Sequence, residues 1–197
     1  GHKTGLYLDQ RENRRIVAGH APGRRVLDAF CYMGAFACQA LKAGAAQALL
    51  LESSAEALAG AEKNLALNGL PGRAELRAGN AFDALRALEA RRERFGVVVL
   101  DPPPFTRRKE SVEAAARGYK EINLRGLRVL EPGGVLATFS CSHHVTPALF
   151  EAICREAAGD AGIAVRVLAT LGPSLDPPVL LNVPESRYLK GLLLQTL

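Results

Sequence analysis

Apolar and polar positions form alternating blocks from about residue 24 to the end of the chain. Short apolar runs of strand length are separated by longer segments whose apolar residues recur at helical spacing. The expected strands span residues 24–30, 46–52, 74–80, 95–101, 134–140, 163–172 and 188–197. The expected helices span residues 34–44, 53–69, 81–94, 110–130 and 146–162.

This alternation predicts an α/β fold of the Rossmann-like type. Strands that are joined through helices lie parallel, and the helices cover both faces of the sheet. The last two strands follow one another with only the connection 173–187 between them. We therefore expect a mostly parallel, seven-stranded sheet that ends in an antiparallel edge hairpin.

Composition narrows the class of protein. The chain is 48% hydrophobic and 23% charged, which is typical of globular proteins. No apolar run reaches the roughly 20 residues that span a bilayer, and no signal peptide is recognisable. Four cysteines lie far apart without a CxxC motif, so we expect neither a disulfide framework nor a metal site, and a cytoplasmic location. The net charge of +5 permits a nucleic-acid partner.

The strand ends carry the candidate cofactor site, because ligands of parallel sheets bind beyond the carboxyl ends of the strands. The first strand leads into Asp28 and a turn with a single glycine, Gly34. A dinucleotide site needs several glycines there, so NAD is disfavoured. S-adenosylmethionine has no phosphate and carries a sulfonium and an ammonium, which suit the acid Asp28.

Two further strand ends extend this candidate site. Glu52 ends the second strand 24 residues after Asp28, close to the spacing at which an acid meets ribose hydroxyls. Asn80 or Asp83, after the third strand, is suited to the edge of adenine. The plainer interpretation of these residues is that they are helix caps and solvated acids.

The fourth and fifth strands end in residues suited to chemistry. Asp101 is followed by three prolines, which hold the loop rigidly, and then by Phe105, which is suited to stacking on a flat ring. Cys141 follows the fifth strand among polar neighbours, where a nucleophile is expected. The alternative is a small buried core residue, which is how we interpret Cys38 and Cys154.

Five segments together resemble one family. They are GHKTGLYLDQRENRR, VLDAFCYMGAF, DPPPF, FSCSHH and VPESRYLKGLLLQ, and they span essentially the whole chain. The sequence resembles the class I S-adenosylmethionine-dependent methyltransferases of the bacterial 23S rRNA (cytosine-5) family, large-subunit methyltransferase I type. The resemblance departs at Cys31-Tyr32-Met33-Gly34-Ala35, where the family more often has Ser-Tyr-Thr-Gly-Gly. Residues 102–104 are all proline, so the second thiol of the two-cysteine RNA cytosine methyltransferases is absent beside Asp101.

The resemblance implies a set of site residues. Cys141 and Asp101 would be catalytic, with Cys141 the nucleophile that attacks carbon 6 of cytosine. The cofactor-binding residues would be Gln10, Arg11, Asp28, Phe30, Cys31, Tyr32, Gly34, Glu52, Ser53, Asn80, Asp101 and Pro103. The candidate RNA-binding residues are Lys3, Phe105, Arg107, Arg187 and Lys190, although solvated surface charge is an equally good interpretation of the basic ones.

The resemblance also implies a domain organisation and partners. Residues 1–23 would be a linker to an N-terminal RNA-binding domain of the PUA type that this chain lacks, and 24–197 the methyltransferase domain. Large-subunit rRNA would be the substrate. The sequence leaves the oligomeric state open, with a homodimer as a candidate. Two alternatives stay open: methylation of a guanine nitrogen through Asp101, and a non-catalytic RNA-binding or assembly module.

Overall fold

The computed structural model describes residues 5–106 and 109–197, without the side chain of residue 109. Its strands are β1 Arg25–Ala29, β2 Gln47–Glu52, β3 Ala74–Ala78, β4 Phe95–Leu100, β5 Leu130–Ser140, β6 Val165–Leu171 and β7 Lys190–Thr196. Its α-helices are α1 Arg11–Ala18, α2 Ala35–Lys42, α3 Ala55–Leu67, α4 Ala81–Ala90, α5 Val112–Arg128 and α6 Pro147–Ala161. Short 3-10 helices lie at Leu8–Gln10, Lys109–Ser111 and Pro184–Ser186.

The described strands form one seven-stranded sheet in the order β3-β2-β1-β4-β5-β7-β6. The pairs from β3 to β5 are parallel, whereas β7 runs antiparallel to both of its neighbours. The predicted fold class is thus confirmed, including the final hairpin. The structure adds that β7 lies inside the sheet, between β5 and β6, and that β6 forms the edge.

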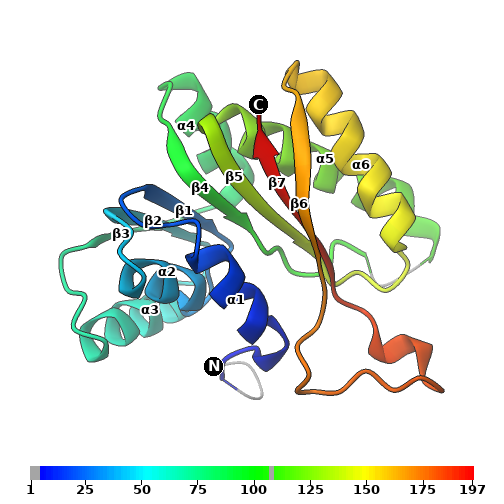
Figure 1. The fold of residues 1–197 in the computed structure, drawn as a ribbon, viewed down its shortest axis with the longest axis horizontal. Helices are drawn as coiled ribbons and strands as arrows, with labels where there is room; N and C mark the ends of the chain where they lie inside the picture. The colour runs from blue at the N-terminus through cyan, green and yellow to red at the C-terminus, as the bar shows by residue number, and fades with distance from the viewer. Residues whose placement is uncertain (1–4, 107–108) are drawn as a thin grey trace.

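Helices cover the sheet on both faces, as Figure 1 shows. One core lies on one face of the sheet and contains side chains from α2 and α3, such as Phe36 and Leu65. The other contains side chains from α4, α5 and α6, such as Leu85, Ile122 and Phe150. All six residues of β4 are buried, because this central strand is covered from both sides.

Local signals in the sequence fix most element boundaries. Ser54 and Thr146 accept hydrogen bonds from the first turns of α3 and α6, which satisfy amides without helical partners. The start of β5 differs from the prediction. The prediction begins the strand at Gly134, after Pro132 and Gly133, but β5 begins at Leu130 and contains this segment beside an irregular register with β4.

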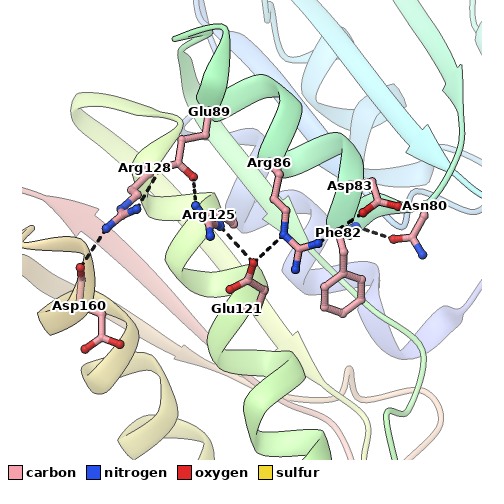
Figure 2. A network of polar contacts seen from close by, with 9 residues as sticks. All are labelled: Asn80, Phe82, Asp83, Arg86, Glu89, Glu121, Arg125, Arg128 and Asp160. Atoms are coloured by element: carbon pink, nitrogen blue, oxygen red, sulfur yellow. Dashed lines mark hydrogen bonds and ion pairs between the residues drawn. The ribbon is translucent and has the colours of Figure 1, made fainter.

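An ion-pair network joins the helices on one face (Figure 2). Glu121 of α5 accepts from Arg86 of α4 at 3.0 Å and from Arg125 at 3.1 Å. Arg128 binds Glu89 of α4 at 3.0 Å and also donates to a carbonyl of α6. These contacts are partly buried and join α4, α5 and α6. Exposed pairs contribute only about 0.2–1 kcal/mol each, and networks such as this one contribute more than isolated pairs.

The segment before β1 is folded onto the rest of the molecule. The β6–β7 connection lies against it, in the lower part of the view in Figure 1. Ser174 accepts from the amide of Glu12 and donates to the carbonyl of Asp9, and Asn13 donates to the carbonyl of Gly172. The prediction that residues 1–23 link to a further domain stays a prediction. Among the described residues, no helix has the length and apolar character that a membrane crossing requires.

Candidate active site

A cleft of about 810 Å³ opens at the carboxyl ends of the parallel strands. This is the size of a cofactor site, and it lies where ligands of such sheets bind. Ten of the predicted cofactor residues line it: Gln10, Asp28, Phe30, Cys31, Tyr32, Glu52, Ser53, Asn80, Asp101 and Pro103. Cys141 and Phe105 line the same cleft.

Asp28 lies on β1, at the point where the strand order reverses between β1 and β4. Its Oδ2 accepts from the amide of Ala37 in the first turn of α2 at 3.0 Å. Its Oδ1 is buried and has no partner among the described residues. Burial raises the pKa of Asp28 to about 7, and the Ala37 hydrogen bond opposes that rise. An unpartnered carboxylate oxygen at this place favours a cationic ligand.

The turn after Asp28 holds its backbone in an unusual conformation. Phe30 and Tyr32 have φ of 62° and 50°, values that few residues other than glycine adopt. The amide of Tyr32 donates to Glu52 Oε2 at 3.0 Å, which ties this turn to the end of β2. Strained backbone of this kind clusters at ligand sites because the surrounding structure must maintain it.

Glu52 is held in place by the chain around it. Its Oε1 accepts from the amides of Ser53 at 2.7 Å and Ser54 at 3.0 Å, and from the Ser53 hydroxyl at 3.0 Å. The carboxylate therefore has a fixed position at the end of β2, in the cleft. A fixed acceptor suits hydroxyl groups of a ligand, because little side-chain freedom is lost on binding.

Aromatic rings form one wall of the cleft. Phe30, Phe82 and Phe105 meet with ring centroids 5.6–6.3 Å apart. Asn80 accepts from the amide of Phe82 at 2.8 Å and so caps α4, as Figure 2 shows. Asp83, the other candidate after β3, is exposed and lies 3.4 Å from Arg86 instead. This wall suits the flat faces of adenine or of a pyrimidine.

Asp101 follows β4 and is held by the N-terminal segment. Gln10 donates to its Oδ1 at 3.0 Å, and Asn13 in turn donates to the Gln10 amide oxygen. Burial raises the pKa of Asp101 to about 7, the Gln10 hydrogen bond opposing the rise. The carboxyl group therefore carries a proton over part of the neutral pH range and can donate a hydrogen bond.

Cys141 follows β5 and faces the proline loop. Its thiol donates to the carbonyl of Pro102 at 3.7 Å. Burial raises the pKa of this thiol to about 12, and the negative charge of Asp101 adds to the rise. The thiol is partly accessible, in contrast to the core residues Cys38 and Cys154, which are buried as interpreted. Of these three thiols, Cys141 is the one that lines the cleft.

The remaining predicted residues lie elsewhere. Arg11 is exposed and pairs with Glu12, and Arg187 is exposed outside the cleft. Gly34 does not line the cleft and lies just before α2, where a Cβ would come within 2.8 Å of Leu50. Lys190 is buried, so its ammonium is not placed at the surface where an RNA phosphate would bind. Lys3 and Arg107 lie outside the described residues.

Three cleft residues were missed by sequence reasoning. Asp9 accepts from the hydroxyl of Tyr188 at 2.5 Å, and both line the cleft beside Cys141. Phe82 completes the aromatic wall. Phe82 could have been identified from the sequence, because it follows a predicted strand end. Asp9 and Tyr188 lie 179 residues apart in the chain, and no local pattern indicates that they meet.

The comparisons with known proteins agree with this geometry. The model of the family described as S-adenosylmethionine-dependent methyltransferase matches residues 1–194. The ribosomal RNA large subunit methyltransferase I of Pseudoalteromonas atlantica is 44% identical over 198 residues, which is 100% of this chain and 50% of that protein. The protein of the same name from Citrobacter koseri is 45% identical over 192 residues, 97% of this chain and 48% of that protein. The chain thus spans about half the length of these curated relatives.

Solved structures extend the likeness to three dimensions. A methyltransferase candidate crystallised with SAH superimposes with a TM-score of 0.87 at 25% identity, over 99% of this chain and 51% of that chain. A SAM-dependent methyltransferase from Agrobacterium tumefaciens superimposes with a TM-score of 0.69 at 19% identity, over 98% of this chain and 62% of that chain. The second likeness concerns the fold alone.

Proposed function

The chain belongs to the S-adenosylmethionine-dependent methyltransferase family, and we propose that it methylates carbon 5 of a cytosine in large-subunit ribosomal RNA. One observation carries the cytosine-5 assignment: the thiol of Cys141 opens into the same cleft as Asp101 and the acids of the cofactor site. The printed names of the curated relatives support ribosomal RNA as the substrate.

The described residues fit S-adenosylmethionine as the methyl donor. The cofactor supplies an electrophilic methyl group on a positively charged sulfur. Asp28 and Glu52 would face its cationic and hydroxyl-bearing parts, and the unpartnered oxygen of Asp28 is the strongest sign of that fit. Arg14 lies in the same cleft and offsets part of the negative charge of Asp28.

The thiol supplies what carbon 5 of cytosine lacks. Carbon 5 is a poor nucleophile, and addition of a thiolate at carbon 6 makes it enamine-like and able to take a methyl group. Asp101 would donate a hydrogen bond to ring nitrogen 3 and stabilise the charge that develops there. Its raised pKa supports this role, because a protonated carboxyl group is a donor. The base must leave its stack to enter such a cleft.

A trapping experiment tests the proposal. Large-subunit rRNA transcribed with 5-fluorocytidine should form an adduct with the chain in the presence of S-adenosylmethionine, because fluorine cannot leave carbon 5 as a cation. The adduct should survive denaturing electrophoresis and map to Cys141 by peptide mass. Cys141→Ser should abolish the adduct and lower turnover by about a thousandfold or more, since a hydroxyl is a far weaker nucleophile than a thiolate.

Matched thiol variants control this experiment. Cys38→Ser and Cys154→Ser remove buried core thiols that do not line the cleft. These two variants should keep the adduct and most of the turnover.

If Cys141→Ser methylates RNA at a rate comparable to the unchanged chain, the cytosine-5 mechanism is wrong, and methylation of a guanine nitrogen through Asp101 becomes the better proposal. If calorimetry detects no binding of S-adenosylhomocysteine, a non-catalytic module is favoured.

A further inference from the structure

Lys190 lies beside the candidate nucleophile. It is the first residue of β7 and pairs with Ser140, the last residue of β5, in the antiparallel register. Its side chain is only 7% exposed. Its Nζ donates to the carbonyl of Ser142 at 2.7 Å, so the ammonium is fixed next to the residue that follows Cys141. The insertion of β7 next to β5 creates this arrangement.

Ser142 makes the surroundings of Lys190 rigid. Its hydroxyl accepts from the amide of Phe105 at 3.1 Å and bonds to the hydroxyl of Tyr119 at 2.9 Å. The residue is fully buried. These bonds join the loop that carries Cys141 to the proline loop that carries Asp101. The ammonium is therefore held by the same loop that carries the thiol.

The Lys190 ammonium forms no ion pair with a carboxylate within the part of the chain that the structure describes. A buried ammonium costs several kcal/mol unless an anion compensates it. Asp101 and Asp9 also act on the Cys141 thiol, and both disfavour its ionisation. Lys190 is the cation that acts on this thiol from β7.

We propose that Lys190 is a positioning residue for the reaction, whose ammonium stabilises the thiolate of Cys141. This inference rests on the proposed function only in one respect, which is that the thiolate adds to carbon 6 of cytosine. It assigns to Lys190 a role inside the active site in place of contact with RNA phosphate. The positive charge of Lys190 opposes the burial that raises the pKa of Cys141, and Cys141 in turn raises the pKa of Lys190, which burial lowers.

The ionisation of Cys141 can be measured without RNA. The intact chain is alkylated with iodoacetamide at pH 6 to 10, and the modification of Cys141 is quantified by peptide mass. In Lys190→Met the rate at pH 8 should fall by about tenfold or more, because a neighbouring charge shifts a pKa by roughly 1–3 units and only the thiolate reacts. Lys190→Gln removes the charge but keeps a donor for Ser142, and it should be slowed to a similar degree.

Two further variants separate charge from structure. Lys190→Arg keeps the positive charge and should react within about threefold of the unchanged chain. Lys42→Met removes an exposed lysine on α2 and should react at the same rate as the unchanged chain. If Lys190→Met and Lys190→Gln are alkylated as fast as the unchanged chain, with the same dependence on pH, the proposal is overturned.

The outcomes separate this inference from the proposed function. A slowed alkylation in Lys190→Gln, together with RNA methylation that survives Cys141→Ser, upholds the role of Lys190 and overturns the cytosine-5 mechanism. The opposite pair of results upholds that mechanism and overturns the role of Lys190. A merely structural role of Lys190 would lower thermal stability without a change in the pH dependence of alkylation.

Discussion

The carboxyl group of Asp28 is buried, and its burial makes the stability of the ligand-free chain depend on pH. The pKa of Asp28 is about 7 in the folded chain and about 3.9 when unfolded. Between about pH 4 and pH 7 the folded chain keeps a proton that the unfolded chain has released, so the free energy of unfolding falls as pH rises. The expected contribution of Asp28 to this loss is of order 2–4 kcal/mol, measured by urea unfolding at pH 5 and pH 8.

Substitution isolates the contribution of Asp28 to this loss. Asp28→Asn should be more stable than the unchanged chain at pH 8 and should lose less stability between pH 5 and pH 8. Some slope should remain, because burial also raises the pKa of Asp101. Asp83→Asn removes an exposed carboxylate and should follow the unchanged chain. A slope in Asp28→Asn equal to that of the unchanged chain would mean that Asp28 is ionised in the fold.

At the scale of elements, Gly34 determines how closely α2 approaches the sheet. It lies just before α2 with φ of 71°, and a Cβ would come within 2.8 Å of Leu50 and 3.1 Å of Ala61. Gly34→Ala should lower the free energy of unfolding by about 2–4 kcal/mol, because backbone strain and overpacking add. The loss is measured by urea unfolding, and it should be accompanied by weaker binding of S-adenosylhomocysteine, since the same turn carries Tyr32.

A second glycine provides the matched control. Gly159 is exposed within α6, and nothing lies within 4 Å of the place that a Cβ would take. Gly159→Ala should raise stability by about 0.5–1 kcal/mol, because alanine favours a helix interior. Equal effects of the two substitutions would contradict the role that the geometry gives to Gly34.

The elements also show what the sequence could predict. The strand ends that carry Asp28, Glu52, Asp101 and Cys141 were predictable, because each depends on a local pattern of apolar run and polar end. The place of β7 was not, because the pairing of β5 with β7 joins residues about 50 positions apart and leaves no periodic signal. The roles of Asp9, Tyr188 and Lys190 depend on that pairing and on the long connection, so local patterns could not reveal them.

At the scale of the whole molecule, the chain has a cleft large enough for a cofactor but few evident features that would bind RNA phosphates. The cleft holds space for a cofactor and is bordered by acids, which repel phosphate groups. The net charge of +5 is modest for a protein that binds RNA by charge alone. The curated relatives are about twice as long, and we expect their additional half to contribute RNA contacts.

The comparison of RNA affinities follows from this expectation. Three proteins are compared on the same rRNA fragment: this chain, the full relative from Pseudoalteromonas atlantica, and the half of that relative that matches this chain. The full relative should bind about 10²–10⁴ times more tightly than this chain or the matching half. Once one of two linked modules is bound, the binding of the second becomes intramolecular. The affinity of the full relative should also fall more steeply with salt, because it neutralises more phosphates. Equal affinities of the full relative and its matching half would show that the methyltransferase half recognises RNA alone, and the search for phosphate contacts would then return to basic residues of this chain such as Arg187.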